Sequence, residues 1–266
     1  MPRLSPDTRT RVSLSELSGV TLMGGPATAR LGYARGGSAE WDTSTAFPAV
    51  ACPDLVTVSW EYSGVTVSAV VELVSARYCT LDEIRAYRAD EFMLGNTSDD
   101  DLFAARAWAE DRIEGSGGAH RFFQPVVRKG WVDRPNCTTV AVPLMGDYPA
   151  HDILEVLSAT DQDGNECEVR RQSAIQLDVR RLKPGSAAEV TMLVGMRETP
   201  PGMRECVMSL AAWHLLPKVT PENATSGTVG DNFMHFVVGG VNGAYTSLPE
   251  VNAFIDRYGF KDYLVR

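Results

Sequence analysis

Apolar and polar residues alternate along the first part of the chain as a β-strand requires. DLVTVSWEY at 54–62 has the two-residue period of a half-buried strand. VTVSAVVELVS at 65–75 is apolar over a longer run, which indicates a second strand that is buried on both faces. Between them, Ser63-Gly64 fits a hairpin turn. Residues 1–50 show little period, and they fit a disordered arm and loose strands equally well.

The pattern changes to helical spacing at Thr80. Thr80 and Glu83 form a capping box, in which each side chain accepts a hydrogen bond from the backbone N–H of the other residue. This helix ends near residues 92–95. A second helix is predicted after Ser98, because apolar residues recur every three or four positions until glycines at 115–118 stop it. Together the two segments predict a helical hairpin.

Strand periodicity returns between residues 122 and 197, which predicts four or five strands. Asp163-Gly164 lies between two of them, at a typical hairpin turn. A third helix is expected after the prolines at 200–201, and Pro217 ends it.

The C-terminal part begins with a polar stretch at 220–231, which is predicted to be a mobile linker. A short strand, FMHFVV at 233–238, follows it. A second capping box is expected at Ser247 and Glu250, opening a last helix that Gly259 closes.

These elements predict an α+β fold with a small helical core. The core consists of the helical hairpin and the third helix, with a β region before it, a small antiparallel β-sheet inserted within it, and a C-terminal docking arm that includes the last helix. The predicted segments are 1–78 for the N-terminal arm and β region, 79–120 for the helical hairpin, 121–198 for the inserted sheet, 199–217 for the third helix, and 218–266 for the linker and docking arm.

Composition narrows the possible functions. The chain has 266 residues, 44% of them hydrophobic, and a formal net charge of −9. That charge argues against a nucleic-acid binder, which gathers Lys and Arg on a basic face. No apolar run reaches the roughly 18 residues of a membrane span, so no membrane association is expected. Five dispersed cysteines without a CxxC pair fit reduced thiols in a cytosol better than a disulfide framework.

Motifs that carry chemistry are sparse. The run Asp99 to Asp101 could hold a metal, but carboxylates are also favourable at the positive end of a helix dipole, and we prefer that interpretation. Asp161 begins a stretch that resembles a calcium loop but has Gln172 where an EF-hand places its glutamate, so a hairpin tip is the better interpretation. The four histidines are widely separated and form no zinc motif. We therefore expect neither an enzyme nor a cofactor nor a metal.

Three stretches taken together resemble the head-to-tail adaptor (connector) proteins of tailed bacteriophages. The first is CTLDEIRAY at 79–87 followed by SDDDLFAARAWAEDRIE at 98–114. The second is VTMLVGMRETPPGMRECVMSLAAWHLL at 190–216, and the third is NGAYTSLPEVNAFIDRYGF at 242–260. Their order and spacing also match, although Ser247 stands where the family usually has glycine. The first fifty residues match weakly at best.

The resemblance implies a structural protein of the virion neck that is assembled in the host cytoplasm. Roughly twelve copies would form a ring below the portal protein and above the stopper or tail-terminator protein, and DNA would pass through without sequence-specific binding. The alternatives are a cytosolic β-sandwich module that binds a peptide or a carbohydrate and, third, a hydrolase.

Two sets of residues are expected to make the contacts of such a protein. The C-terminal arm, which we expect to be separable from a folded core, would dock on the portal. Its docking residues are Phe233, Phe236, Leu248, Phe254, Tyr258, Phe260 and Tyr263. The helices would contact neighbouring subunits in the ring. Their contact residues are Asp99, Asp100, Asp101, Arg106, Trp108 and Arg112.

Overall fold

The computed structural model describes residues 2–48, 51–115, 117–134, 139–146, 148–216, 226–229, 232–235 and 245–260. It divides the chain into two compact units, each made of two segments. We call residues Met1–Arg77 and Phe122–Glu198 the β unit, and residues Tyr78–Arg121 and Thr199–Arg266 the helical unit.

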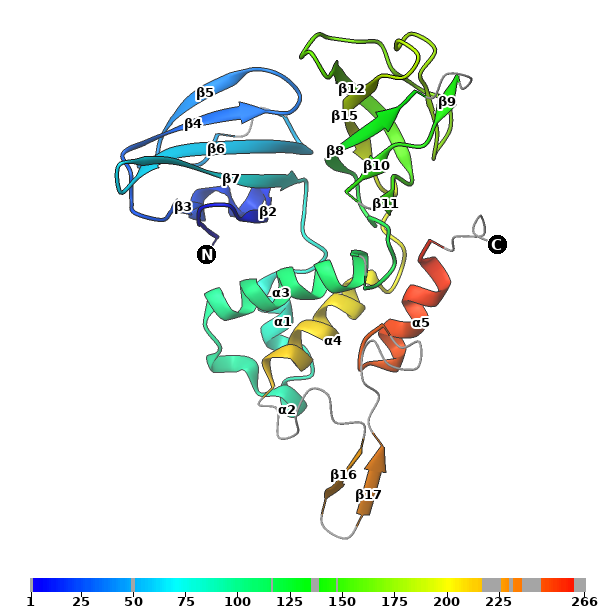
Figure 1. The fold of residues 1–266 in the computed structure, drawn as a ribbon. Coiled ribbons are helices and arrows are strands. Elements are labelled where there is room, and N and C mark those ends of the chain that lie inside the picture. The colour runs from blue at the N-terminus through cyan, green and yellow to red at the C-terminus, as the bar shows by residue number, and fades with distance from the viewer. Residues whose placement is uncertain are drawn as a thin grey trace. The chain divides into compact units, whose positions relative to one another are not determined.

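The first half of the β unit is a five-stranded sheet, the N-terminal sheet, shown in blue to cyan in Figure 1. Its order is β2 (Arg9–Ser13), β7 (Val65–Val74), β6 (Asp54–Tyr62), β4 (Thr28–Tyr33) and β5 (Ser38–Asp42). Only β2 and β7 run parallel, and the other neighbours are antiparallel. Ser63 and Gly64 join β6 to β7, both with positive φ (53° and 79°), as a two-residue hairpin turn requires.

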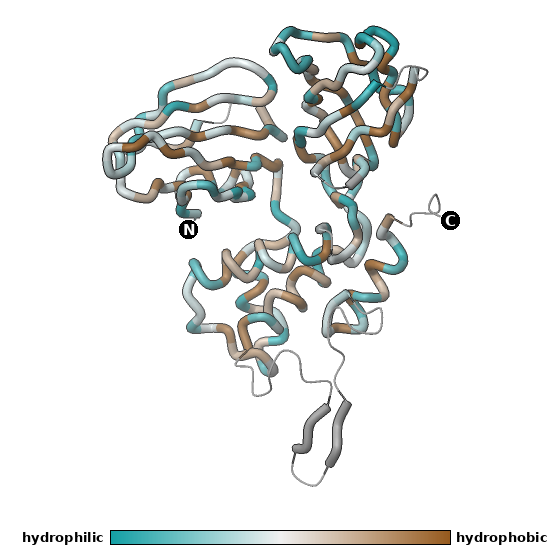
Figure 2. The backbone as a smooth tube through the Cα atoms, in the orientation of Figure 1, coloured by the Kyte–Doolittle hydropathy of each residue, from teal (hydrophilic) through white to brown (hydrophobic). Residues whose placement is uncertain are grey.

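The apolar face of the N-terminal sheet packs into its own core. Val58, Val71 and Trp41 lie in this core, each at most 1% exposed. Leu4 and Leu22 complete the core from the short parallel pair β1 (Arg3–Leu4) and β3 (Thr21–Leu22). The 3₁₀ helix η1 (Leu14–Gly19) adds Leu17 to it. Figure 2 shows brown, apolar segments among paler ones along these strands.

The second half of the β unit, residues 122–198, contains two sheets. The five-stranded sheet has the order β11 (Tyr148–Pro149), β10 (Leu144–Met145), β8 (Val126–Asp133), β15 (Ala187–Val194) and β12 (Ile153–Asp161). The three-stranded sheet has the order β13 (Arg170–Arg171), β14 (Leu177–Asp178) and β9 (Val140–Ala141). A shared core joins them, and Val74 at the end of β7 packs into it.

The helical unit contains α1 (Leu81–Ala86), α2 (Ala89–Phe92), η2 (Leu94–Asn96), α3 (Asp99–Glu114), α4 (Met203–Leu215) and α5 (Pro249–Tyr258). A hairpin of β16 (Ser226–Val229) and β17 (Asn232–His235) lies between α4 and α5 in the sequence. Helix α4 packs against α1, α3 and α5, and it is brown over much of its length in Figure 2. The apolar positions of α4 therefore form the centre of this unit.

Two of the predicted helix starts are confirmed by their capping hydrogen bonds. The N–H of Glu83 donates to the Thr80 hydroxyl at 3.2 Å, and the Thr80 N–H donates to the Glu83 carboxylate at 2.9 Å. The N–H of Asp101 donates to the Ser98 hydroxyl at 3.2 Å. Gly115 caps the end of α3, as the glycine run predicted.

The predicted fold class, a small helical core with β additions, is wrong. More residues lie in strands than in helices, and the fold is a strand-rich mixture of α and β elements. Residues 2–48 form strands rather than a disordered arm, because Leu31, Trp41 and other apolar residues of alternating runs fill a core of their own. The N-terminal region and residues 122–198 also belong to one unit, instead of being two separate additions.

The predicted capping box at Ser247 and Glu250 is also absent. Leu248 is the N-cap residue and Pro249 is in the first turn, while the Glu250 carboxylate accepts from the Ser209 hydroxyl of α4 at 3.1 Å. Helix α5 is therefore held on the unit rather than carried on a free arm. Val251 and Ile255 are buried, at 0% and 2% exposure.

This packing predicts that α5 cannot be removed without loss of stability. Phe254 is 7% exposed, and Phe254→Ala should destabilise the helical unit by about 3–5 kcal/mol because it leaves a cavity. Hydrogen exchange of the α4 and α5 amides measures the change within this unit. The surface variant Arg257→Ala should change stability by less than about 0.5 kcal/mol. Equal protection in both variants would show that α5 is separable after all.

Candidate functional site

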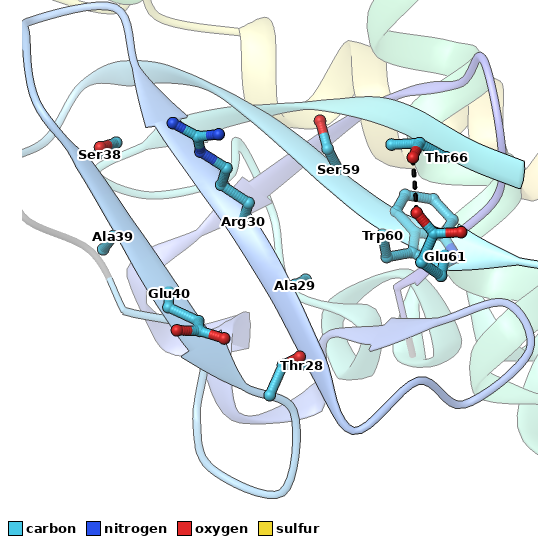
Figure 3. Close-up of a pocket in the computed structure, with 10 residues that line it drawn as sticks. All are labelled: Thr28, Ala29, Arg30, Ser38, Ala39, Glu40, Ser59, Trp60, Glu61 and Thr66. Atoms are coloured by element: carbon cyan, nitrogen blue, oxygen red, sulfur yellow. Dashed lines mark hydrogen bonds between the residues drawn. The ribbon is translucent and has the colours of Figure 1, made fainter.

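An open pocket of about 540 Å³ lies on the outer face of the N-terminal sheet (Figure 3). It is lined by Thr28, Ala29, Arg30, Ser38, Ala39, Glu40, Ser59, Trp60, Glu61 and Thr66. These residues come from strands β4, β5, β6 and β7, whose apolar faces point the opposite way, into the core. Along these strands, apolar side chains face the core and the polar side chains between them face the pocket.

Strand register sets the order of the charged groups in this pocket. Arg30 on β4 is the register partner of Glu40 on β5 and of Ser59 on β6, and Figure 3 shows its guanidinium group directed away from the Glu40 carboxylate. One strand further, Glu61 lies opposite Thr66, and the Thr66 hydroxyl donates to the Glu61 carboxylate at 2.6 Å. The pocket thus offers ionic and hydroxyl groups in neighbouring rows.

Trp60 is the one aromatic residue among those that line the pocket, and it does not present its ring there. It is 3% exposed, and its indole N–H donates to the Met23 carbonyl at 3.0 Å. The lining contains no cysteine and no histidine, and its hydroxyl groups come from Thr28, Ser38, Ser59 and Thr66. Its charged and hydroxyl groups suit hydrogen bonding to a polar ligand.

A second charged cluster lies inside the β unit, around Glu72 of β7. This carboxylate is 3% exposed and receives Arg11 of β2 at 2.9 Å and Arg128 of β8 at 2.7 Å. Arg9 of β2 lies 3.4 Å from it. Burial alone would raise the pKa of Glu72, but the three guanidinium groups outweigh it and lower this pKa to about 2.

The predicted ring residues at the start of α3 are exposed but engaged. Asp99 pairs with Arg85 of α1, and the Asp101 carboxylate accepts from the Ser98 hydroxyl at 2.7 Å. Asp100 is exposed in the first turn. The Asp99 and Asp101 carboxylates therefore have partners within the helical unit. Within the described residues, no group of three or more His, Cys, Asp or Glu side chains is placed to hold a metal ion.

The other predicted ring residues lie further along α3. Arg106 is 2% exposed and donates to the Cys79 carbonyl at 2.9 Å, so it stabilises the inside of the unit and offers nothing to a neighbouring subunit. Trp108 is half-buried and stacks on the His214 ring of α4, with 4.1 Å between ring centroids. Arg112 is half-buried in the last turn.

The predicted docking residues do not form one exposed surface. Phe254 is buried and packs on Tyr258, with 4.9 Å between ring centroids. Leu248 and Phe260 are half-buried, and the Phe260 N–H donates to the Ala119 carbonyl at 2.8 Å. Phe233 lies on β17, where the backbone alone is described. Two further predicted residues, Phe236 and Tyr263, lie outside the described residues.

Three of the described cysteines, Cys52, Cys167 and Cys206, are poor candidates for a nucleophile. Burial, with help from nearby Glu205 and Glu250, raises the pKa of the Cys206 thiol to about 12. Burial also raises the pKa of Cys52 and of Cys167. A reactive thiolate needs the opposite shift.

Two surface features were not predicted from the sequence, namely the pocket and a group of exposed apolar residues. Trp131, Val142 and Leu144 are 50%, 41% and 45% exposed. A signal for each feature was present in the sequence. Arg30 and Glu40 occupy the polar positions of the alternating runs TARLGY and SAEWD, and Trp131 occupies a polar-face position of VVRKGWVD.

Comparisons with known proteins identify no family for this chain. Neither a protein-family model nor a curated protein matches it. Within the described residues, no helix combines the length and the apolar character that crossing a membrane requires.

The Glu72 cluster predicts a pH-dependent stability. Glu72→Gln should destabilise the β unit by about 3–5 kcal/mol at neutral pH, because it leaves guanidinium groups without their buried partner. The folded-state pKa of about 2 lies below the ordinary value of 4.5. The stabilisation by wild-type Glu72 is therefore fully present above about pH 4.5 and is lost as the pH falls towards 2.

Urea unfolding of wild type and variant across this pH range measures the effect. The difference between them should shrink steadily below about pH 4.5. Glu155→Gln, an exposed glutamate on β12, is the control and should show little difference at any pH. A gap between wild type and Glu72→Gln that stays constant down to pH 2 would contradict the proposed electrostatic origin.

Proposed function

We propose that this protein is a ring-forming subunit of a tailed-bacteriophage neck, a head-to-tail adaptor between the portal and the stopper or tail-terminator protein. The observation that supports this most is the packing of the helical unit. Most of the residues that carry the resemblance lie in α1 to α3, α4 and α5, while residues 190–194 belong to β15. These helices pack together although residues 122–198 separate α3 from α4 in the sequence. If the short motifs matched by chance, there would be no reason for the helices that contain them to pack in the same unit.

The charge of the chain is compatible with a DNA conduit. Each copy has a formal net charge of −9, and a ring of roughly twelve copies would total about −108. Like charges repel, so DNA would pass such a ring without adhering to it. The protein would act by shape and contact, not by catalysis.

The hairpin of β16 and β17 is the element we assign to portal docking. Within the described residues these two strands pair only with each other. An isolated two-stranded hairpin is at best marginally stable in water, and its strand edges can pair with a partner. Because α5 is held in the helical unit, the docking segment is narrower than the arm that the sequence predicted.

A hairpin replacement tests this proposal. Residues 226–235 are exchanged for a Gly-Ser linker of equal length, which should leave α3 and α4 protected in hydrogen exchange. Binding to the portal protein from the same genome, measured by co-sedimentation, should fall at least about tenfold.

A replacement of the β12 hairpin tip at residues 162–165 serves as the control and should bind normally. The proposal fails if the chain is absent from purified tailed particles. The docking assignment alone fails if the linker variant attaches like wild type.

The pocket on the N-terminal sheet favours a second function, a module that binds a carbohydrate or a polar peptide. Arg30 is the register partner of Glu40 and of Ser59, and a ligand hydroxyl or carboxylate can receive a charge-assisted hydrogen bond from its guanidinium group.

A screen of glycans and peptides against the purified chain tests this function. Arg30→Ala should weaken binding by at least about tenfold, because a charge-assisted hydrogen bond contributes about 1.5–3 kcal/mol. Arg170→Ala, an exposed arginine on β13, is the matched control. If no ligand binds, or if the two variants bind alike, the pocket is not a ligand site.

A further inference from the structure

Strand β5 forms one edge of the N-terminal sheet (Figure 1). Within the described residues it pairs with β4 alone, so its other side lacks a neighbouring strand. Neither a proline nor a register shift interrupts the strand. An open edge of this kind presents a row of backbone N–H and C=O groups to which a further strand can bind.

The hydrogen bonds at the two ends of β5 determine which of its backbone groups point away from β4. The Tyr33 N–H donates to the Gly37 carbonyl at 3.1 Å, and the Thr43 N–H donates to the Ala27 carbonyl at 3.0 Å. Directly opposite residues of an antiparallel pair alternate between bonded and non-bonded pairs. The odd-numbered residues of β5 therefore bond to β4, and the even-numbered residues direct their backbone groups away from it.

The outward backbone groups belong to Ser38, Glu40 and Asp42. The Asp42 carbonyl accepts from the Thr45 N–H at 3.0 Å, so this group is already bonded within the chain. Among the described residues, none bonds to the backbone N–H or C=O groups of Ser38 and Glu40. These two residues offer two donors and two acceptors to a strand placed beside β5.

The same two residues also line the pocket on the outer face of the sheet. The Glu40 side chain is exposed, and within the part of the chain that the structure describes it makes no hydrogen bond or ion pair. Figure 3 shows its carboxylate at the β5 side of the pocket, away from the guanidinium group of Arg30. The open edge and an unpaired carboxylate thus lie side by side.

The charges on β5 select the kind of strand that can pair with it. Glu40 and Asp42 are two residues apart and share the exposed face. If two copies of β5 paired antiparallel over their full length, Glu40 would lie opposite Glu40. Like charges directly opposite each other destabilise a strand pair, whereas opposite charges stabilise it. Lysine or arginine at alternate positions therefore suits this edge.

Strand β2 of this chain, RTRVS, also has arginine at alternate positions. Its Arg9 and Arg11 side chains bind Glu72 inside the β unit, and its backbone pairs with β7. The arginines of β2 in a second copy are therefore already engaged. The basic strand that fits β5 belongs to a different protein.

We propose that β5 binds an extended basic segment of a partner protein, which adds to the edge of the N-terminal sheet as a further strand. The backbone of this segment bonds to Ser38 and Glu40, and a lysine or arginine opposite Glu40 pairs with its carboxylate. In strand addition, main-chain hydrogen bonds provide affinity, and the contacts of alternate side chains provide selectivity.

This inference rests on the second proposed function, the binding module, and specifies its ligand as a basic peptide. A sugar ring often stacks on an exposed aromatic side chain, but Trp60 is the aromatic residue of the lining and is buried. The open backbone of β5, in contrast, has a direct use in binding a peptide.

Binding of two synthetic peptides to the purified full chain tests the proposal. Both have blocked ends and are about eight residues long, within the usual length of a strand. One alternates threonine with lysine, and the other alternates threonine with glutamate. Fluorescence anisotropy should show that the lysine peptide binds at least about tenfold more tightly. Glu40→Lys should reduce or reverse this preference.

Two substitutions of Glu40 separate the contribution of its charge from that of its backbone. Glu40→Gln should weaken binding of the lysine peptide by about two- to fivefold, as expected for one cross-strand ion pair. Glu40→Pro also removes the outward N–H and should weaken binding at least about tenfold further. This N–H does not bond to β4, so proline leaves the β4 pairing in place. Glu155→Gln on β12 is the control and should bind like wild type.

Hydrogen exchange measured by NMR locates the added strand. In the free chain the amides of Ser38 and Glu40 should exchange rapidly, while β4 protects those of Ala39 and Trp41. The lysine peptide should slow exchange at Ser38 and Glu40 and leave the other two amides unchanged. A peptide that contacts only the side chains of the pocket would slow none of them.

The outcomes separate strand addition from the wider binding function. If the lysine peptide does not bind, or binds without protecting Ser38 and Glu40, strand addition is overturned. A glycan or another peptide whose binding depends on Arg30 would then still support the second proposed function. If no ligand of either kind binds, both fail. Equal binding of the lysine and glutamate peptides overturns the choice of a basic partner.

Discussion

A single buried carboxylate, that of Glu72, connects the two halves of the β unit. Arg9 and Arg11 approach it from β2, and Arg128 approaches it from β8. A lone charge at 3% exposure would be strongly unfavourable, so the three strands that supply these groups must come together for Glu72 to remain ionised. Arg128 also lies over the Phe122 ring, 4.3 Å from its centroid, where the chain re-enters the unit. The N-terminal sheet and the second sheet are thereby connected by charge as well as by apolar contact.

Specific polar contacts also connect distant segments of the sequence in the helical unit. Arg106 is buried in α3 and donates to the Cys79 carbonyl at the segment that precedes α1. Trp108 of α3 stacks on His214 of α4. These polar and aromatic contacts orient helices whose apolar faces alone would allow several packings. Both units thus combine an ordinary apolar core with a few specific contacts between segments that are distant in the sequence.

Local features of the fold could be predicted from the sequence, because neighbouring residues determine them. The Thr80 capping box, the turns at Ser63 and Asp163, and the end of α3 are of this kind. What could not be predicted depends on distant partners. Arg106 is an arginine on a helix, yet it is buried and bonds to the Cys79 carbonyl 27 residues earlier. Glu250 accepts from Ser209 of another helix instead of capping its own. The pocket around Arg30 depends on the register of four strands, which no single run of sequence specifies. The resemblance to an adaptor family rests mainly on helical stretches, whereas more residues of the fold lie in strands.

The chain passes between the two units three times, at residues 77–78, 121–122 and 198–199. During synthesis the helices before residue 121 emerge before α4, which forms the centre of their unit. The β unit is complete only after residues 122–198 have been synthesised, which is before the last segment of the helical unit. Each unit therefore begins to form before the other is finished, and the two folding processes are interleaved on the ribosome. A force that pulls the two folded units apart is divided over three covalent connections. Neither unit can therefore be separated from the other by breaking a single linker.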